Sequence, residues 1–193
     1  MSYDPLSDIP RHKVPYSAVC LVPPKDLWPP IQAIRREHDP QIHRWMPHVT
    51  LLYPFLMEEY LRTAATALEP VCASCDGFVI TLDSFSYFEH DSGIATMYVE
   101  PRPVHPICDL HERLLKRVPW CDDVDRFKSG FTPHLSVGRF PLDEVEPARK
   151  QLEQGWSAIR WEVTEVSVIA RSADGSGPFS VAYTLPLGGL DGE

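Results

Sequence analysis

The chain has 193 residues, of which 44% are hydrophobic and 23% charged, as in an ordinary folded globular protein. Its net charge of −9 argues against binding along a long nucleic-acid duplex, since such binding depends on clustered Lys and Arg. The chain contains no long uncharged apolar run, and its first residues lack the apolar core of a secretory signal. We therefore expect an intracellular, cytoplasmic protein that does not enter a membrane.

Hydrophobic periodicity predicts alternating strands and helices along the chain. A strand at 16–22 precedes a helix at 23–39, and a strand at 48–55 precedes a helix at 58–71. The later elements are predicted in the order strand, strand, helix, strand, helix, strand and strand, at 78–88, 94–101, 106–118, 134–140, 142–156, 159–170 and 179–186. Residues 119–132 are expected to form a polar loop, and the two ends, 1–15 and 188–193, to be flexible.

The sequence contains an internal repeat. Residues 47–55 read PHVTLLYPF and residues 133–140 read PHLSVGRF, so that His48 and His134 lie 134 − 48 = 86 residues apart. Tyr98 and Tyr183, near the ends of the two predicted hairpins, lie 183 − 98 = 85 apart. We expect an α+β fold of two pseudo-symmetric lobes of antiparallel sheet, with outer helices around a central cleft. No flexible linker divides the lobes, so residues 1–193 are expected to form one domain.

The repeated motifs suggest phosphoester chemistry. Side chains on a strand alternate in direction, so His48 and Thr50 share one face, as do His134 and Ser136 on the second strand. A neutral imidazole can accept a proton from an attacking hydroxyl, and a protonated one can donate a proton to a leaving oxygen. The two hydroxyls can donate hydrogen bonds to phosphate oxygens. A repeated structural histidine, or a pocket that binds nucleotides without turnover, is the alternative interpretation.

A zinc-dependent protein is a further rival. Cys72 and Cys75 form one CxxC pair, and Cys108 and His111 lie three residues apart on a predicted helix, so four groups could together hold zinc. The chain has no second CxxC pair, and a free cysteine is often just a small buried side chain. An odd number of cysteines in an intracellular chain also does not indicate a disulfide framework. We expect no metal and no cofactor.

The two H-x-[S/T] motifs resemble those of the 2H phosphoesterase superfamily, and the resemblance extends over about residues 16–187. This superfamily includes 2′–5′ RNA ligase-like proteins and 2′,3′-cyclic phosphodiesterases. The resemblance implies metal-independent hydrolysis of a 2′,3′-cyclic phosphate to a 2′-phosphate, with His48, Thr50, His134 and Ser136 in the catalytic places. The substrate would be a cyclic nucleotide or an RNA end and the protein a monomer, with 2′–5′ RNA ligation at the same site as an alternative.

The resemblance also suggests residues that contact the substrate. Members often carry a Tyr or Arg five residues after a motif histidine, which here points to Tyr53 and Arg139 as substrate-binding residues. Strict alternation would turn both away from the histidines, so a twist or bulge is required. Five aromatic residues are candidates for stacking on a base: Trp28, Trp45, Phe55, Tyr87 and Phe131.

Overall fold

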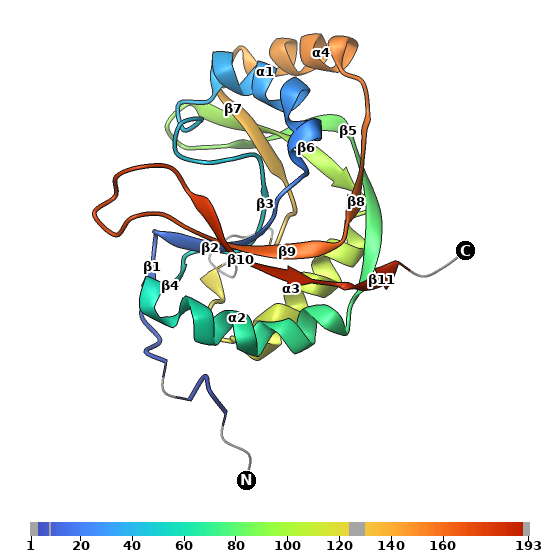
Figure 1. Ribbon diagram of the computed structural model, residues 1–193. Coiled ribbons are helices and arrows are strands. Elements are labelled where there is room, and N and C mark those ends of the chain that lie inside the picture. Colours follow the sequence, from blue (N-terminus) through green and yellow to red (C-terminus); the bar gives the residue numbers. More distant parts are fainter. Residues whose placement is uncertain (1–3, 8, 124–129, 191–193) are drawn as a thin grey trace.

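The computed structural model describes residues 4–7, 9–123 and 130–190, and its core consists of two sheets (Figure 1). The first sheet has the order β10-β9-β2-β3, formed by Ser180–Pro186, Glu165–Ala170, Ser17–Leu21 and Val49–Leu52. The second has the order β11-β5-β6-β7, with β8 also paired to β5, formed by Gly188–Leu190, Asp76–Glu89, Ile94–Arg102, Leu135–Pro141 and Ile159–Val163. The two histidine motifs therefore lie on the last strand of different sheets, as predicted.

Helices cover the outer sides of the two sheets. A short 3₁₀ turn (Lys25–Leu27) leads into α1 (Trp28–His38), which packs with α4 (Val145–Gly155) against the sheet that contains β7. The opposite side of the molecule is covered by α2 (Glu58–Ala73) and α3 (His105–Arg117) (Figure 1). The predicted α+β arrangement of two lobes is confirmed. None of the helices in the described ranges is both long and apolar enough to span a bilayer.

The hairpins that follow the motif strands are exchanged between the sheets. The β5–β6 hairpin follows β3 in the chain but pairs with β7, and the β9–β10 hairpin follows β7 but joins the sheet of β3. Tyr98 consequently lies on the strand next to β7, whereas β9 and β2 separate Tyr183 from β3. The proposed equivalence of these two tyrosines is wrong, because the strands next to the motifs are β6 and β2.

The strand predicted over 159–170 is divided between the two sheets. β8 pairs with β5 and β9 pairs with β2, and Thr164 separates them. Thr164 instead accepts a backbone hydrogen bond from Leu187, 2.9 Å away. Both halves carry buried apolar residues, so the sequence pattern did not show that the chain changes partner there.

Both chain ends contribute more structure than predicted. Leu6 and Ile9 are buried in the main core, and β1 (Lys13–Val14) pairs with β4 (Phe55–Leu56). Near the other end, β11 adds a parallel strand to β5. The described parts of 1–15 and 188–193, which were expected to be flexible, thus contain buried side chains and paired strands. These short segments are ordered by tertiary partners far away in the sequence. Of the predicted loop 119–132, residues 124–129 lie outside the described residues.

Gly138 permits the close approach of α1 to β7. A Cβ atom at position 138 would lie 2.5 Å from the Cβ of His38 and 3.0 Å from its carbonyl oxygen, and both belong to the helix end that packs here. We expect Gly138→Ala to lower the free energy of unfolding by about 1–3 kcal/mol, as overpacking does. Urea unfolding measures the change. Gly155→Ala is the control, since its Cβ would meet nothing within 4 Å; equal stability of the two variants would contradict the prediction.

Candidate active site

The first motif strand contains an extra residue directly after its hydroxyl residue. On β3, Thr50 lies opposite Cys20 of β2, and Leu52 lies opposite Val19. Thr50 and Leu52 are two positions apart on β3, whereas their partners on β2 are adjacent. Leu51 is therefore the extra residue of a β-bulge. Beyond the bulge the alternation of side chains is shifted by one residue.

The second motif strand has a bulge at the equivalent position. On β7, Ser136 lies opposite Tyr98 of β6, and Gly138 lies opposite Met97, which makes Val137 the extra residue. The two bulges are 137 − 51 = 86 residues apart, the same separation as the two histidines. The structural repeat therefore includes the irregularity of each strand as well as its motif.

The bulges change the direction of the two residues that follow five positions after the histidines. Directly opposed residues share a face of a sheet, and Arg139 lies opposite Thr96, two residues from Tyr98. Arg139 therefore shares the face of Ser136 and is exposed. Tyr53 lies just beyond β3 and lines the same cavity as Thr50. The bulge that the resemblance requires is present in both strands.

The two motif histidines are held in the same way. The Nδ1 atom of His48 lies 2.7 Å from the carbonyl oxygen of Met46, and the Nδ1 atom of His134 lies 2.8 Å from that of Thr132. A carbonyl oxygen can only accept a hydrogen bond, so Nδ1 carries the hydrogen in both rings. The Nε2 atom of each neutral ring then has a free lone pair, and it becomes a donor when the ring is protonated.

A buried ion pair lies beside His48. The pKa of His48 is lowered to about 4, mainly by burial and in smaller part by the charges of Arg35 and His134, while the hydrogen bond to Met46 opposes the shift. Arg35 is only 2% exposed; it forms an ion pair with Asp39 at 2.8 Å and donates to the carbonyl oxygen of Trp45 at 2.8 Å. The negative charge of Asp39 acts in the opposite direction on His48. Motif reasoning missed this pair.

His134 has a more apolar environment. Burial lowers the pKa of His134, while its hydrogen bond to Thr132 opposes the shift. The ring of Phe88 meets it edge-on at 4.9 Å, and the ring of Tyr98 lies 5.4 Å away. Phe88 and Tyr98 also stack on each other at 4.5 Å. Both aromatic residues come from the exchanged hairpin, which sequence alternation could not assign to this sheet.

A cavity of about 630 Å³ opens beside Thr50 and His134, and His48 does not line it. It is lined by Thr50 and Tyr53 from the first motif, by His134, and by residues of the β5–β6 hairpin and α3. On the α3 side, the Nδ1 atom of His111 lies 2.9 Å from the carbonyl oxygen of Leu51, and the ring of Phe131 stacks on His111 at 3.9 Å. His111 thus supports the bulge of β3 as well as the cavity wall.

The four groups of the zinc hypothesis do not meet. His111 lines the cavity, whereas Cys72 and Cys75 lie at the end of α2, where the Cys75 thiol contacts the carbonyl oxygen of Val71. In the parts of the chain that the structure covers, no three His, Cys, Asp or Glu side chains are grouped to hold a metal. The zinc hypothesis is therefore wrong for the described residues.

The aromatic candidates divide into three groups. Phe55 is fully buried in the core and cannot contact a base. Tyr87 and Phe131 line the cavity beside His134. Trp28 and Trp45 line a separate cavity of about 720 Å³. The ring of Trp45 is stacked on His48 at 4.9 Å and on Phe179 at 3.8 Å, so its ring already has aromatic partners.

Comparison with known proteins agrees with this architecture. The family described as the 2′-5′ RNA ligase superfamily matches residues 23–175. A candidate phosphoesterase of Geobacillus kaustophilus is 30% identical over 175 residues, covering 90% of this chain and 96% of the relative. Another candidate phosphoesterase, from Geobacillus strain WCH70, is 25% identical and covers 91% and 98% of the two chains.

Solved structures show the same fold. A protein of Thermus thermophilus superposes with a TM-score of 0.62 at 14% identity, covering 90% of this chain and 98% of that one. Escherichia coli LigT, crystallised with ATP, gives a TM-score of 0.57 at 18% identity, with coverage of 90% and 98%. Fold, paired motif strands and family match define a 2H-type phosphoesterase fold. The chain belongs to the 2′-5′ RNA ligase superfamily.

The lowered pKa of His48 predicts a specific acid sensitivity. Between pH 6.5, the ordinary value, and about pH 4, the unfolded chain binds a proton that the folded site resists, so acid favours unfolding there. His48→Gln cannot titrate. Its free energy of unfolding should fall less over this range, by on the order of 2 kcal/mol.

Urea unfolding at pH 7, 5.5 and 4.5 measures this difference. His105→Gln makes the same replacement at an exposed side chain of α3 and serves as the control. If His48→Gln and the wild type lost stability in parallel as the pH falls, the neutral state of buried His48 would be ruled out.

Proposed function

We propose that this protein is a metal-independent phosphodiesterase that opens a 2′,3′-cyclic phosphate by paired-histidine acid–base catalysis. The observation that carries the proposal is that two imidazoles, on equivalent strands of two lobes, present Nε2 from the same tautomer. One such nitrogen can accept a proton while the other donates one. These groups supply both proton transfers of the reaction, so the mechanism requires no metal ion.

The surroundings of the two histidines suggest how the roles are divided. The charge of Arg35 adds to burial in lowering the pKa of His48, whereas burial is the cause that lowers the pKa of His134, so a fixed positive charge favours the neutral form of His48 in particular. Paired groups whose environments separate their pKa values take different acid–base roles. We therefore assign His48 as general base and His134 as general acid in cyclic-phosphate opening.

The proposed reaction transfers two protons and replaces one P–O bond by another. The Nε2 atom of His48 takes a proton from water, whose oxygen forms a bond to phosphorus. The P–O3′ bond breaks with its electron pair on O3′, and protonated His134 donates its Nε2 proton to that oxygen. The ribose keeps a 2′-phosphate. His48 then loses its proton to solvent and His134 gains one.

Other motif residues would bind the phosphate group. Thr50 and Ser136 share the faces of their histidines and can donate hydroxyl hydrogen bonds to non-bridging oxygens, where charge accumulates. Arg139 adds a positive charge on the face of Ser136, and Tyr53 lines the cavity with Thr50. We assign Tyr53 and Arg139 as substrate-binding residues.

A nucleotide substrate fits both the site and its relatives. The cavity beside His134 is lined by the aromatic rings of Tyr87 and Phe131 as well as by polar groups, as nucleotide sites are. LigT has been crystallised with ATP, with NADP⁺ and with 3′-AMP. Together with the net charge of −9, these features favour a short nucleotide or an RNA end over a long duplex.

Replacement of the motif histidines tests the proposal directly. His48→Ala and His134→Ala should each lower kcat for a nucleoside 2′,3′-cyclic phosphate by about 10²–10⁴-fold, because each removes one proton transfer. EDTA should leave the rate unchanged. His105→Ala, at an exposed position of α3, is the control. Turnover that survives the double replacement would refute the assignment.

Two other outcomes would indicate a binding module or a ligase in place of a phosphodiesterase. A protein that binds a nucleoside 2′-phosphate but opens no cyclic phosphate would be a binding module. Formation of a 2′–5′ diester from a cyclic phosphate and a 5′-hydroxyl would indicate ligation at this site. In ligation the base would take its proton from the 5′-hydroxyl in place of water.

Protonation should accompany phosphate binding. The pKa of both histidines is lowered in the free protein, so both rings are neutral near pH 7.5, and a bound phosphate anion must raise the pKa of the acid. We expect a nucleoside 2′-phosphate to bind with uptake of a proton and to bind more weakly as pH rises. Calorimetry in two buffers of different ionisation enthalpy measures the uptake.

The His134→Gln variant identifies the group that is protonated. It should remove most of the proton uptake at pH 7.5, whereas His48→Gln should retain it. Equal uptake by His134→Gln and wild-type protein would contradict the assignment of His134 as the acid.

A further inference from the structure

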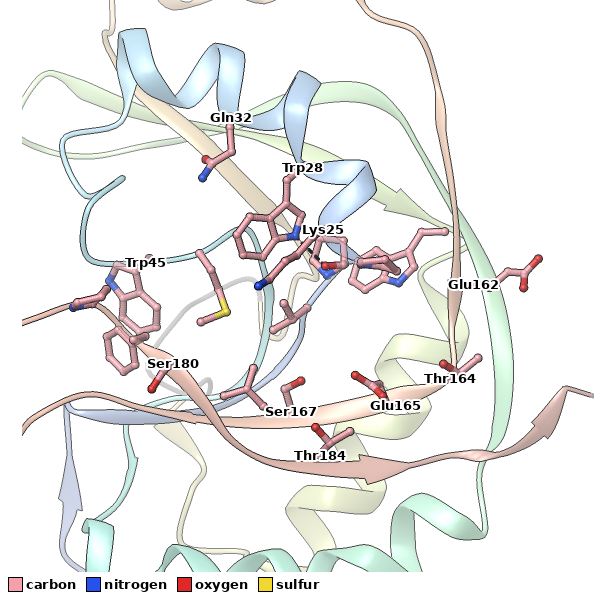
Figure 2. A pocket seen from close by; sticks show the side chains of 18 of the residues that line it. Lys25, Trp28, Gln32, Trp45, Glu162, Thr164, Glu165, Ser167, Ser180 and Thr184 are labelled. Atoms are coloured by element: carbon pink, nitrogen blue, oxygen red, sulfur yellow. Dashed lines mark hydrogen bonds between the residues drawn. The ribbon is translucent and has the colours of Figure 1, made fainter.

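A second cavity lies beside Trp45 and Met46, which come shortly before His48 in the chain. It has a volume of about 720 Å³, which is within the range of small-ligand sites. Figure 2 shows Lys25, Trp28 and Gln32 from the α1 side above it, and Ser167 and Thr184 from β9 and β10 below. None of the four motif residues lines it, so the proposed reaction leaves this cavity unexplained.

The cavity is joined to the catalytic motif through the residues just before His48. Trp45 and Met46 line it; the Trp45 ring stacks on His48, and the Met46 carbonyl oxygen accepts the His48 hydrogen bond. A ligand group in the cavity would therefore lie directly beside the support of His48. Trp45 forms the boundary between the cavity and that ring.

A row of residues across the first sheet connects the two cavities. Thr50, Cys20, Ser167 and Thr184 lie opposite one another on β3, β2, β9 and β10, and so they share one face. Thr50 lines the first cavity, and Ser167 and Thr184 line the second. Adjacent strands are about 4.8 Å apart, so Thr50 and Ser167 are separated by about 10 Å. Cys20, which lies between them, is fully buried, so a ligand that reaches both residues passes over the side chains that cover it.

The walls suit a neutral aromatic group that carries hydroxyls. The Trp28 indole is held by a 2.7 Å hydrogen bond to the carbonyl oxygen of Pro23 and faces the cavity (Figure 2). The Ser167 hydroxyl lines the cavity although the residue is only 1% exposed, and among the described residues it has no hydrogen-bond partner. Such a group is available to a ligand.

The charges in the cavity are balanced. Lys25 and Glu165 bring opposite signs, and Glu162 forms an ion pair with Arg160 and points away in Figure 2. The cavity therefore has no excess charge for a second phosphate or for a cation. An aromatic base and a ribose, which together are neutral and rich in hydrogen-bonding groups, match these walls.

We propose that this cavity is a second nucleoside-binding site, with Trp28 as the stacking platform and Ser167 and Thr184 as hydrogen-bonding groups. The proposal rests on the phosphodiesterase function and narrows it to substrates with two nucleosides. The second nucleoside is either the one upstream of a terminal cyclic phosphate or the one joined through the reacting phosphate.

Binding of three ligands tests the proposal and separates these two positions. The ligands are a nucleoside 2′-phosphate, a dinucleotide that ends in a 2′-phosphate, and a 2′–5′ dinucleoside monophosphate. We expect one of the two longer ligands to bind at least tenfold more tightly than the first. The upstream position favours the dinucleotide, and the joined position favours the diester. If neither binds more tightly, the proposal is overturned.

Variants show whether any gain comes from this cavity. Trp28→Ala should lower the affinity ratio of the better long ligand to the nucleoside 2′-phosphate about tenfold, and Trp28→Phe should restore part of it. Thr184→Val should lower the same ratio severalfold. Thr66→Val, at an exposed position on α2, is the matched control. Unchanged ratios in Trp28→Ala and Thr184→Val would overturn the proposal.

The two proposals can fail separately. If the long ligand binds through Trp28 and Thr184 but no cyclic phosphate is opened, the phosphodiesterase function fails and the second site stands. If cyclic mononucleotides are opened and the longer ligands gain nothing, the reverse holds. If Trp28→Ala does not fold, Thr184→Val decides, since Thr184 is exposed and its replacement keeps the shape of the side chain.

Discussion

Alternation of side chains along a strand is the constraint on which the whole site depends. It places His48 and Thr50 on one face and keeps Val49 in the core. A single extra residue, Leu51 in β3, then shifts the alternation so that Tyr53 lines the cavity with Thr50. The equivalent bulge in β7 turns Arg139 to the face of Ser136. Without these bulges each strand would offer a histidine and a hydroxyl only.

The backbone holds His48 and His134 in the same way, but the side chains around the two rings differ. Both histidines donate from Nδ1 to a carbonyl oxygen two residues earlier, which leaves the same nitrogen available in each. Arg35 is positioned by Asp39 near His48, while aromatic rings surround His134. The duplicated strand thus sets where the two imidazoles lie, and non-duplicated neighbours give them different environments. In the proposed reaction, this difference distinguishes the base from the acid.

The site could be predicted from sequence further than the fold could. The four motif residues follow from two short segments, because alternation within a strand is a local property. The exchange of hairpins could not be predicted, since β5 and β9 have the apolar pattern of a strand whichever sheet they join. The ordered ends were missed for a similar reason: Leu6, Ile9 and β11 gain their order from distant residues. Phe55 was a predicted candidate for stacking on a base, but its side chain is fully buried.

The sequence by itself determined which residues repeat, which face each motif residue takes, and the class of chemistry that two histidines and two hydroxyls can perform. Only the tertiary structure decided which hairpin pairs with which motif strand, where the bulges fall, and that Arg35 lies beside His48. It also showed a second cavity, behind Trp45, whose walls come from four separate parts of the chain. Backbone pairing and charge proximity between distant segments depend on packing, and a local sequence pattern does not record them.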